Sequence, residues 1–335
     1  MLSIIVALIT LSLLIVVHEC GHFGAARRLG ISVTEFGLGF PPRLIAKRFL
    51  GSVFSLNLIP LGGFVRLKGE ASPEGGSDSY YERPAMQRMM VLLAGPMANL
   101  LLAPLLFTAS TMVSDIAGYE VVFIEPDGPA AHSGVLPGDV IKAVDGSPVG
   151  RAGDPGGIIG ISNKDLVTFT VDRGSQILQI PVAPRANPPD GQGPIGVRLH
   201  PSFSPTPVDV AVQRGVVYTI RSLIVIPRHV IDVLGGAELE VSGPVGIVNV
   251  FGEATRYGPE FVLFLAGLIS AQLALFNLLP WPVLDGGRIT LIIVEILRRR
   301  RLSRSQEAAI NFTGMALLIM LVLMVTMRDV QQLIN

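Results

Sequence analysis

Long apolar segments dominate this 335-residue sequence, and their lengths limit the folds open to it. Four of them lie at residues 1–26, 87–113, 261–297 and 305–330. Each approaches or exceeds the ~20 residues that an α-helix needs to cross a hydrocarbon core of ~30 Å. Half of all residues are hydrophobic, 16% are charged, and the mean hydropathy is +0.56. We therefore predict an α-helical polytopic membrane protein with four transmembrane helices and a soluble part.

Lysine and arginine predict the orientation of these helices. They cluster in residues 27–86, after the first segment, and again between the third and fourth segments at Arg298–Arg301. Because cytoplasmic loops are enriched in these residues, both connections should be cytoplasmic. The two termini and residues 114–260 are then extracytoplasmic. A cleaved signal peptide is the alternative for the first segment, but no Lys or Arg precedes its apolar run.

Residues 206–260 include an apolar stretch that could be read as a fifth membrane span. In this stretch Arg214, Arg221 and Arg228 recur every seven residues and so share one face of a helix. That pattern is typical of an amphipathic helix lying at the membrane interface. A fifth crossing would also move Arg298–Arg301 out of the cytoplasm. We therefore predict amphipathic interfacial helices for residues 206–260.

Residues 115–205 differ from the rest in alternating short β-type runs with Gly, Pro and Asp turns. The stretch "GPAAHSGVLPGDVIKAVDG" (128–146) predicts a short helix ending near Gly134, and residues 166–184 predict a hairpin turning at Asp172–Ser175. The region resembles a bacterial PDZ domain. Such domains add an extended peptide to a sheet edge, so the resemblance implies a peptide or protein partner. We predict an inserted extracytoplasmic PDZ-like α+β domain here.

Two histidines and a glutamate stand at the inner end of the first apolar segment, in "HECGH". His18 and His22 are four residues apart, so a helix presents both from one face, where two neutral imidazoles can share one metal ion. Glu19 is placed to face a water on that metal, as in the H-E-x-x-H pattern of zinc proteases. The alternative is a pair of core histidines with an ion-paired glutamate. Ionisable groups are costly in hydrocarbon, which favours a functional role.

A third ligand is expected, because catalytic zinc usually takes three from the protein. Asp285 is the best candidate, in "FNLLPWPVLDGG", where prolines and glycines should break the helix. Broken helices are tolerated at membrane depth when they line a cavity. With four spans, Asp285 and His22 both lie toward the cytoplasmic side. The alternative is that Asp285 only caps the next helix.

These motifs together resemble the site-2 protease family of intramembrane zinc metalloproteases, with its bacterial members as the nearest type. The stretches "GLGFPPRL", "PLGGFVRLKGE", "AGPMANLL" and "SGPVGI" extend the resemblance over nearly the whole chain. It implies one Zn²⁺ per chain held by His18, His22 and Asp285, with Glu19 as the catalytic base and Asn277 contacting the substrate. It also implies the bacterial inner membrane. The chain has room for one PDZ domain, where some members carry two.

The resemblance also assigns a membrane-associated, re-entrant β-hairpin to about residues 50–70. Phe54, Leu56 and Leu58 alternate there, and Gly62 and Gly63 suit a turn. A helical substrate must unwind before its carbonyls are open to attack, and an extended strand could hold it. We therefore expect Gly63 and Phe64 to contact substrate. The alternative is a surface hairpin in the cytoplasm.

The resemblance implies cleavage within the transmembrane segment of a single-pass membrane protein, such as an anti-sigma factor already cut by another protease. This is regulated intramembrane proteolysis. Two other classes remain open: a non-catalytic peptide-binding scaffold in the membrane, and an ion-coupled transporter, since broken helices with an aspartate also bind ions. The formal net charge of zero gives no indication of a nucleic-acid partner.

Overall fold

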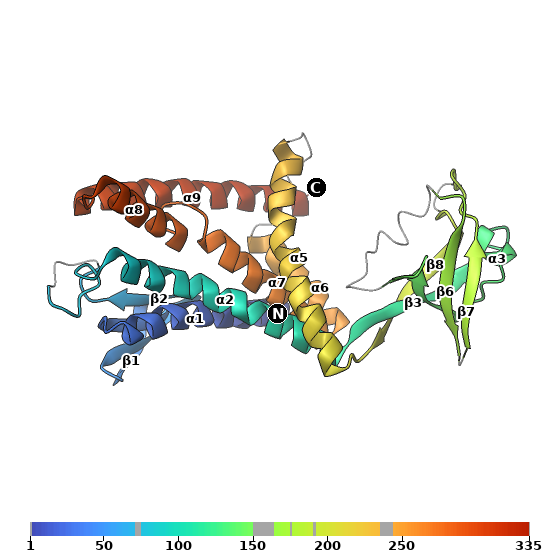
Figure 1. Cartoon of the computed structure of the whole chain (residues 1–335), viewed down its shortest axis with the longest axis horizontal. Helices are drawn as coiled ribbons and strands as arrows, with labels where there is room; N and C mark the ends of the chain where they lie inside the picture. Colours follow the sequence, from blue (N-terminus) through green and yellow to red (C-terminus); the bar gives the residue numbers. More distant parts are fainter. Residues whose placement is uncertain are drawn as a thin grey trace. The chain divides into compact units, whose positions relative to one another are not determined.

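The computed structural model describes residues 2–70, 75–149, 164–174, 176–189, 192–234 and 244–334. The chain forms two compact units, one of residues 1–107 with 219–335 and one of residues 108–218. The first unit is largely helical, and the second contains a β-sheet (Figure 1).

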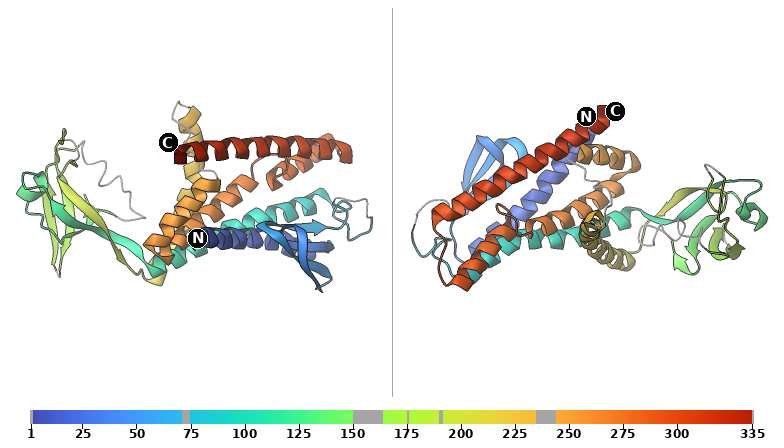
Figure 2. Two further views of the ribbon diagram at one scale, coloured as in Figure 1. Left: turned by 180° about the vertical axis from the view of Figure 1, so that it is seen from behind. Right: turned by 90° about the horizontal axis from the view of Figure 1, so that it is seen from above.

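Within the described residues, four helices are long and apolar enough to cross a membrane. They are α1 (Leu2–Arg28), α2 (Ala85–Val113), α7 (Pro259–Asn277) and the Ser305–Arg328 part of α9 (Arg304–Ile334). In the helical unit α1 and α2 run side by side, as the different views in Figures 1 and 2 show. These helices and the separate β-sheet fit a polytopic membrane protein.

The predicted third span consists of two helices. α7 ends at Asn277, and α8 (Asp285–Arg298) begins after a connection at residues 278–284. Pro280 and Pro282 lie in this connection, and proline cannot donate the backbone hydrogen bond that a helix interior needs. The break falls within the segment 261–297, where the prolines and glycines predicted it.

The described parts of residues 206–260 are mostly helical and form α5 (Val208–Leu234) and α6 (Pro244–Tyr257). α5 is not among the four helices that meet the length and hydropathy of a membrane span. That these helices lie at the membrane interface remains a prediction.

The predicted hairpin is longer than residues 50–70 and folds differently. Its strands are β1 (Val33–Phe49) and β2 (Ser52–Leu67), joined at Leu50–Gly51. Residues 35–38 of β1 pair with residues 63–66 on one side and with residues 53–56 on the other. The two halves of β2 therefore flank the first half of β1 and are not paired through a turn at Gly62–Gly63, while residues 45–48 of β1 pair with the other side of residues 53–56. The sequence prediction missed this because the partner strand precedes the alternating stretch.

The second unit contains a six-stranded sheet in the order β7-β6-β4-β3-β8, with β5 paired to β4. Its elements are β3 (Asp115–Ile124), α3 (Pro129–His132), β4 (Val140–Val144), β5 (Ser147–Pro148), β6 (Val167–Arg173), β7 (Gln176–Val182) and β8 (Val197–Ser204). Inward residues such as Val121, Ile141 and Phe169 form its core. β6 and β7 are antiparallel up to Arg173 opposite Gln176, and Ser175 of the predicted turn lies outside the described residues. The PDZ assignment remains a prediction.

Close contacts between the helices position the first two spans against each other. A Cβ added to Gly21 of α1 would lie 2.2 Å from the carbonyl oxygen of Ala94 in α2, so only glycine allows this approach. Small residues at such crossings are common in membrane bundles. Farther along α2, the Ser270 hydroxyl of α7 donates to the Asn99 carbonyl at 2.8 Å. The bundle thereby fixes α1, α2 and α7 against one another.

Candidate metal centre

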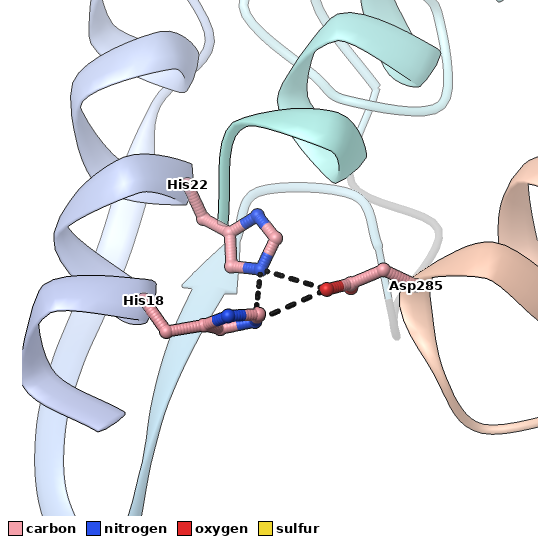
Figure 3. A group of neighbouring side chains, drawn as sticks. All are labelled: His18, His22 and Asp285. Atoms are coloured by element: carbon pink, nitrogen blue, oxygen red, sulfur yellow. Dashed lines mark hydrogen bonds and ion pairs between the residues drawn. The ribbon is translucent and has the colours of Figure 1, made fainter. Parts of the chain in front are cut away.

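His18, His22 and Asp285 meet in the helical unit, although 267 residues separate the first from the last. The Nε2 atom of His18 lies 3.1 Å from Oδ2 of Asp285 and 3.1 Å from Nε2 of His22. Nε2 of His22 lies 3.3 Å from the same aspartate oxygen. Figure 3 shows the three side chains pointing toward one another from α1 and α8. Both histidines are buried, and Asp285 is partly buried.

The backbone of α2 fixes which nitrogen of His22 faces the cluster. Nδ1 of His22 lies 2.8 Å from the Val91 carbonyl oxygen. A carbonyl only accepts, so Nδ1 must carry the hydrogen, and the neutral ring then presents the lone pair of Nε2 to the other two residues. An imidazole that donates its second nitrogen to a carbonyl is the usual arrangement for a metal-ligating histidine.

The three residues fit zinc. Their ligand atoms lie within 4.8 Å of one another, and the three separations above are 3.1–3.3 Å. A tetrahedral zinc with bonds of about 2.0–2.1 Å separates its ligands by about 3.3–3.4 Å. Two imidazoles and a carboxylate also form a donor set that zinc prefers. One cation among these atoms would satisfy them together.

Gly95 of α2 provides the space beside the two imidazoles. A Cβ at this position would lie 2.3 Å from Nε2 of His22 and 2.8 Å from Nε2 of His18. The helix backbone therefore approaches the cluster closely, and no other residue type fits there. The sequence analysis did not single out Gly95 as part of the site, although the small residues of "LAGPMAN" were the available signal.

Asp285 reaches the histidines because the start of α8 packs tightly on the preceding loop. A Cβ on Gly286 would lie 2.3 Å from the Leu278 carbonyl oxygen, and one on Gly287 would lie 2.0 Å from that of Trp281. The loop in turn rests on α9, where Trp281 Nε1 donates to the Gly314 carbonyl at 3.2 Å. The two glycines after the aspartate are therefore required by close backbone contact.

The cluster opens into a cavity of about 790 Å³ that also takes in every other predicted site residue. Glu19, Asn277, Gly63 and Phe64 all line it. A Cβ on Gly63 would lie 3.2 Å from Cγ of Glu19, so β2 passes directly beside the expected base. The Asn277 side chain donates to the Leu273 carbonyl at 2.9 Å, within its own helix. The structure thus brings together all seven residues that the sequence analysis named.

Among the charged residues of this cavity that were not predicted, two form an ion pair. They are Glu70, which follows β2, and Arg288, which lies in the first turn of α8. Both stand in stretches that the sequence analysis quoted or adjoined, "RLKGE" and "LDGGR", but nothing in their spacing along the chain indicated that they meet.

Comparison with known proteins agrees with this geometry. Residues 6–321 match peptidase family M50. A Clostridium perfringens protein named "Putative zinc metalloprotease CPE1693" is 32% identical over 98% of both chains. The Arabidopsis thaliana protein named "Membrane metalloprotease ARASP, chloroplastic" is 32% identical over 98% of this chain and 78% of its own length. With these relatives and the family match over nearly its whole length, the chain belongs to peptidase family M50 and is a multi-pass membrane zinc metalloprotease.

Proposed function

We propose that this protein cleaves single-pass membrane proteins within their transmembrane segments. The observation that carries the proposal is the position of the metal cluster. His18 and His22 belong to a 27-residue apolar helix, α1, and are buried there beside a cavity. A metal site at that depth suits a substrate that is itself in the membrane, because ionisable groups are costly there and are retained for a function.

In this proposal His18, His22 and Asp285 hold the zinc ion, one per chain. Zinc, when bound, supplies a Lewis acid that polarises the scissile carbonyl and makes water a nucleophile at neutral pH. The hydrogen bond from His22 to the Val91 carbonyl keeps that ring in the ligating tautomer. The close packing of Gly286 and Gly287 holds Asp285 toward the histidines.

Glu19 acts as general base and then as general acid. It follows His18 directly and lines the same cavity, so its carboxylate can reach a water beside the cluster. It takes the proton of the attacking water and later delivers it to the nitrogen of the leaving amine. Asn277, at the end of α7, lines the cavity as well and is placed to hydrogen-bond the substrate backbone.

The substrate is held extended along β2. A helical segment satisfies its own backbone groups, so its carbonyls become accessible only after local unwinding. Within the described residues, residues 63–67 pair with β1 on one side only, which leaves the other edge for an added strand. Gly63 and Phe64 line the cavity at this edge. The β1–β2 sheet then lies in or on the membrane, as the hairpin prediction requires.

The finer parts of the proposal concern location and partners. We place the protein in a bacterial inner membrane, with both termini and the β-sheet unit extracytoplasmic. The substrate is a single-pass protein, such as an anti-sigma factor, that another protease has already shortened. The β-sheet unit acts as a PDZ domain toward a peptide or protein. The arginines between α8 and α9 support this orientation.

Glu19→Gln tests the proposal. The protein is co-expressed with single-pass candidates, and cleavage within the span is compared among parent, Glu19→Gln and Cys20→Ser, a control at the adjacent exposed position. We expect Glu19→Gln to keep its zinc and lose cleavage, because the ligands survive and only the base is lost. Cys20→Ser should retain both.

Asp285→Asn separates the ligand role from the base role, because an amide binds zinc more weakly than a carboxylate. Zinc content and cleavage should fall together in this variant.

Full cleavage by Glu19→Gln would contradict the base assignment, and stoichiometric zinc in an active Asp285→Asn would contradict the ligand assignment. A parent that binds its partners but never cleaves them would favour a scaffold, and one that moves ions across vesicles would favour a transporter.

A further inference from the structure

Asp285 lies in the first turn of α8, so the rotation of that turn decides where its carboxylate points. The N-cap of α8, Leu284, makes no side-chain cap hydrogen bond, and Val283 before it has a φ of 86°, which β-branched residues rarely adopt. Close packing on the 278–284 loop restrains this turn at Gly286 and Gly287. A side-chain contact from the same turn would be a second restraint on the rotation of the helix about its own axis.

Arg288 provides such a restraint. It follows Asp285 by three residues, so both side chains project from the same face of α8. Its Nη1 donates to Oε1 of Glu70, and both partners of this ion pair are partly buried and line the cavity of the metal cluster. An arginine held in this way limits how far the first turn can rotate.

Glu70 is itself fixed to the end of β2. Its second carboxylate oxygen, Oε2, accepts from the backbone N–H of Leu67 at 3.3 Å, and its own N–H donates to the Leu67 carbonyl at 3.2 Å. The same loop is held by Lys68, whose Nζ lies 2.7 Å from Oδ1 of Asp78. The two oxygens of the Glu70 carboxylate thus link Leu67, the last residue of β2, to Arg288 in the first turn of α8.

We propose that Glu70 and Arg288 are positioning residues for Asp285. Their ion pair ties the helix that carries the third predicted ligand to the strand that passes beside Glu19. In this proposal the pair acts on neither the histidines nor the substrate directly; it holds the Asp285 carboxylate at the distance from His18 and His22 that a metal ion requires. This inference rests on the proposed function, because it takes Asp285 as a ligand.

The test measures the metal site without relying on proteolysis. The full-length protein in detergent is titrated with zinc against a chelator, and Co²⁺ is bound in place of zinc, because its visible absorption reports coordination geometry. The variants are Glu70→Gln, Arg288→Gln, their double variant and Arg288→Lys. Asp78→Asn is the matched control, since it removes from the same loop a carboxylate that bonds Lys68 and Ser32 and not Arg288.

We expect Glu70→Gln and Arg288→Gln each to weaken zinc binding by ~10–100-fold, the range for residues that orient a ligand, and to change the cobalt spectrum. The double variant should be no weaker than either single variant, because both remove the same interaction. Arg288→Lys should recover part of the affinity. Asp78→Asn should stay within about twofold of the parent.

Three outcomes would overturn the inference. They are unchanged zinc affinity and cobalt spectrum in both single variants, additive losses in the double variant, and an equal loss in Asp78→Asn, which would indicate general loosening of the loop. The proposed function fails by different measurements. It is contradicted if Glu19→Gln still cleaves or if His18→Ala retains its zinc.

Discussion

At the scale of single residues, Gly95 decides whether the metal cluster has room to form. Its backbone lies where a Cβ would come within 3 Å of a nitrogen on each histidine. A larger residue must therefore push the imidazoles apart or move α2 away from α1. The contribution of Gly95 is the absence of a side chain, which no inspection of titratable residues reveals.

We predict that Gly95→Ala abolishes zinc binding and proteolysis while the protein still folds. The added methyl would lie 2.3 Å from the ligating nitrogen of His22, and the flanking helix backbone cannot easily retreat. Zinc content of the purified variant is the measurement. Gly24→Ala in α1 is the matched control, since nothing lies within 4 Å of its added Cβ, and it should bind zinc normally. Normal zinc content in Gly95→Ala would show that the cluster forms elsewhere or differently.

The sequence predicted the members of the cluster because its chemistry is local. The four-residue spacing of His18 and His22 defines a face, and the isolation of Asp285 in a broken helix singled it out. Gly95, the Val91 carbonyl, Glu70 and Arg288 were not predicted. Their roles depend on contacts between segments far apart in the chain, and glycine or backbone atoms carry no chemical signature of a site.

At the scale of elements, the turn that enters β4 depends on a single buried carboxylate. Asp139 is 1% exposed. Its carboxylate accepts hydrogen bonds from Nε and Nη2 of Arg173 at 2.7 and 2.8 Å and from the Leu136 N–H at 2.8 Å. Burial alone would raise the pKa of Asp139, but its hydrogen bonds with Arg173 and Leu136 hold that pKa below the ordinary value. The charged form thus ties the turn to β6.

We predict that this tie is lost in acid. The pKa of Asp139 is lower in the folded than in the unfolded chain, so its stabilisation is complete above the ordinary value of about 3.9 and disappears as the pH falls below it. Because the loss continues as the pH falls toward the lower pKa of the folded chain, Asp139→Asn should lower the unfolding temperature of the β-sheet unit at pH 7 and by less at pH 3. Hydrogen bonds to charged groups contribute about 1.5–3 kcal/mol each, which sets the scale of the effect.

Thermal unfolding followed by circular dichroism at both pH values measures this difference. Asp172→Asn is the control, because its carboxylate is more exposed and lies 4.0 Å from Lys142. It should change the unfolding temperature little at either pH. An equal loss in Asp139→Asn at pH 3 and pH 7 would show that the charge of Asp139 does not supply the stability.

Helices were easier to predict than the β1–β2 sheet for a physical reason. An apolar segment of membrane length determines its own secondary structure, because every backbone group must be satisfied within it. A strand has no such autonomy, since its partner can lie anywhere. Residues 53–56 and residues 63–66 share one partner, residues 35–38, and the alternation in residues 54–58 does not indicate it.

At the scale of the whole molecule, the β-sheet unit is inserted into the helical one as a separable piece. The chain enters it along β3 and leaves along β8, and these strands pair from Asp115 opposite Ser204 to Ile124 opposite Val197. Tyr119 and Pro201 are direct partners across this pair. The unit can therefore be removed between them with a very short linker, while the paired ends that connect it to the helices remain.

We predict that this deletion relaxes substrate selection without harming the metal site. His18, Glu19, His22 and Asp285 all belong to the helical unit, so zinc content should be unchanged. If the β-sheet unit is extracytoplasmic and restricts access, a substrate with a bulky outer domain is excluded by size, whereas a shortened one passes. Cleavage of the shortened substrate should then persist, and cleavage of the full-length substrate should rise.

The measurement is the ratio of the two cleavage rates in the deletion relative to the parent, with Glu19→Gln in the same deletion as the inactive control. An unchanged ratio in a folded, zinc-loaded protein would show that the unit does not act as a size filter, and loss of the shortened substrate alone would instead indicate that the unit binds it.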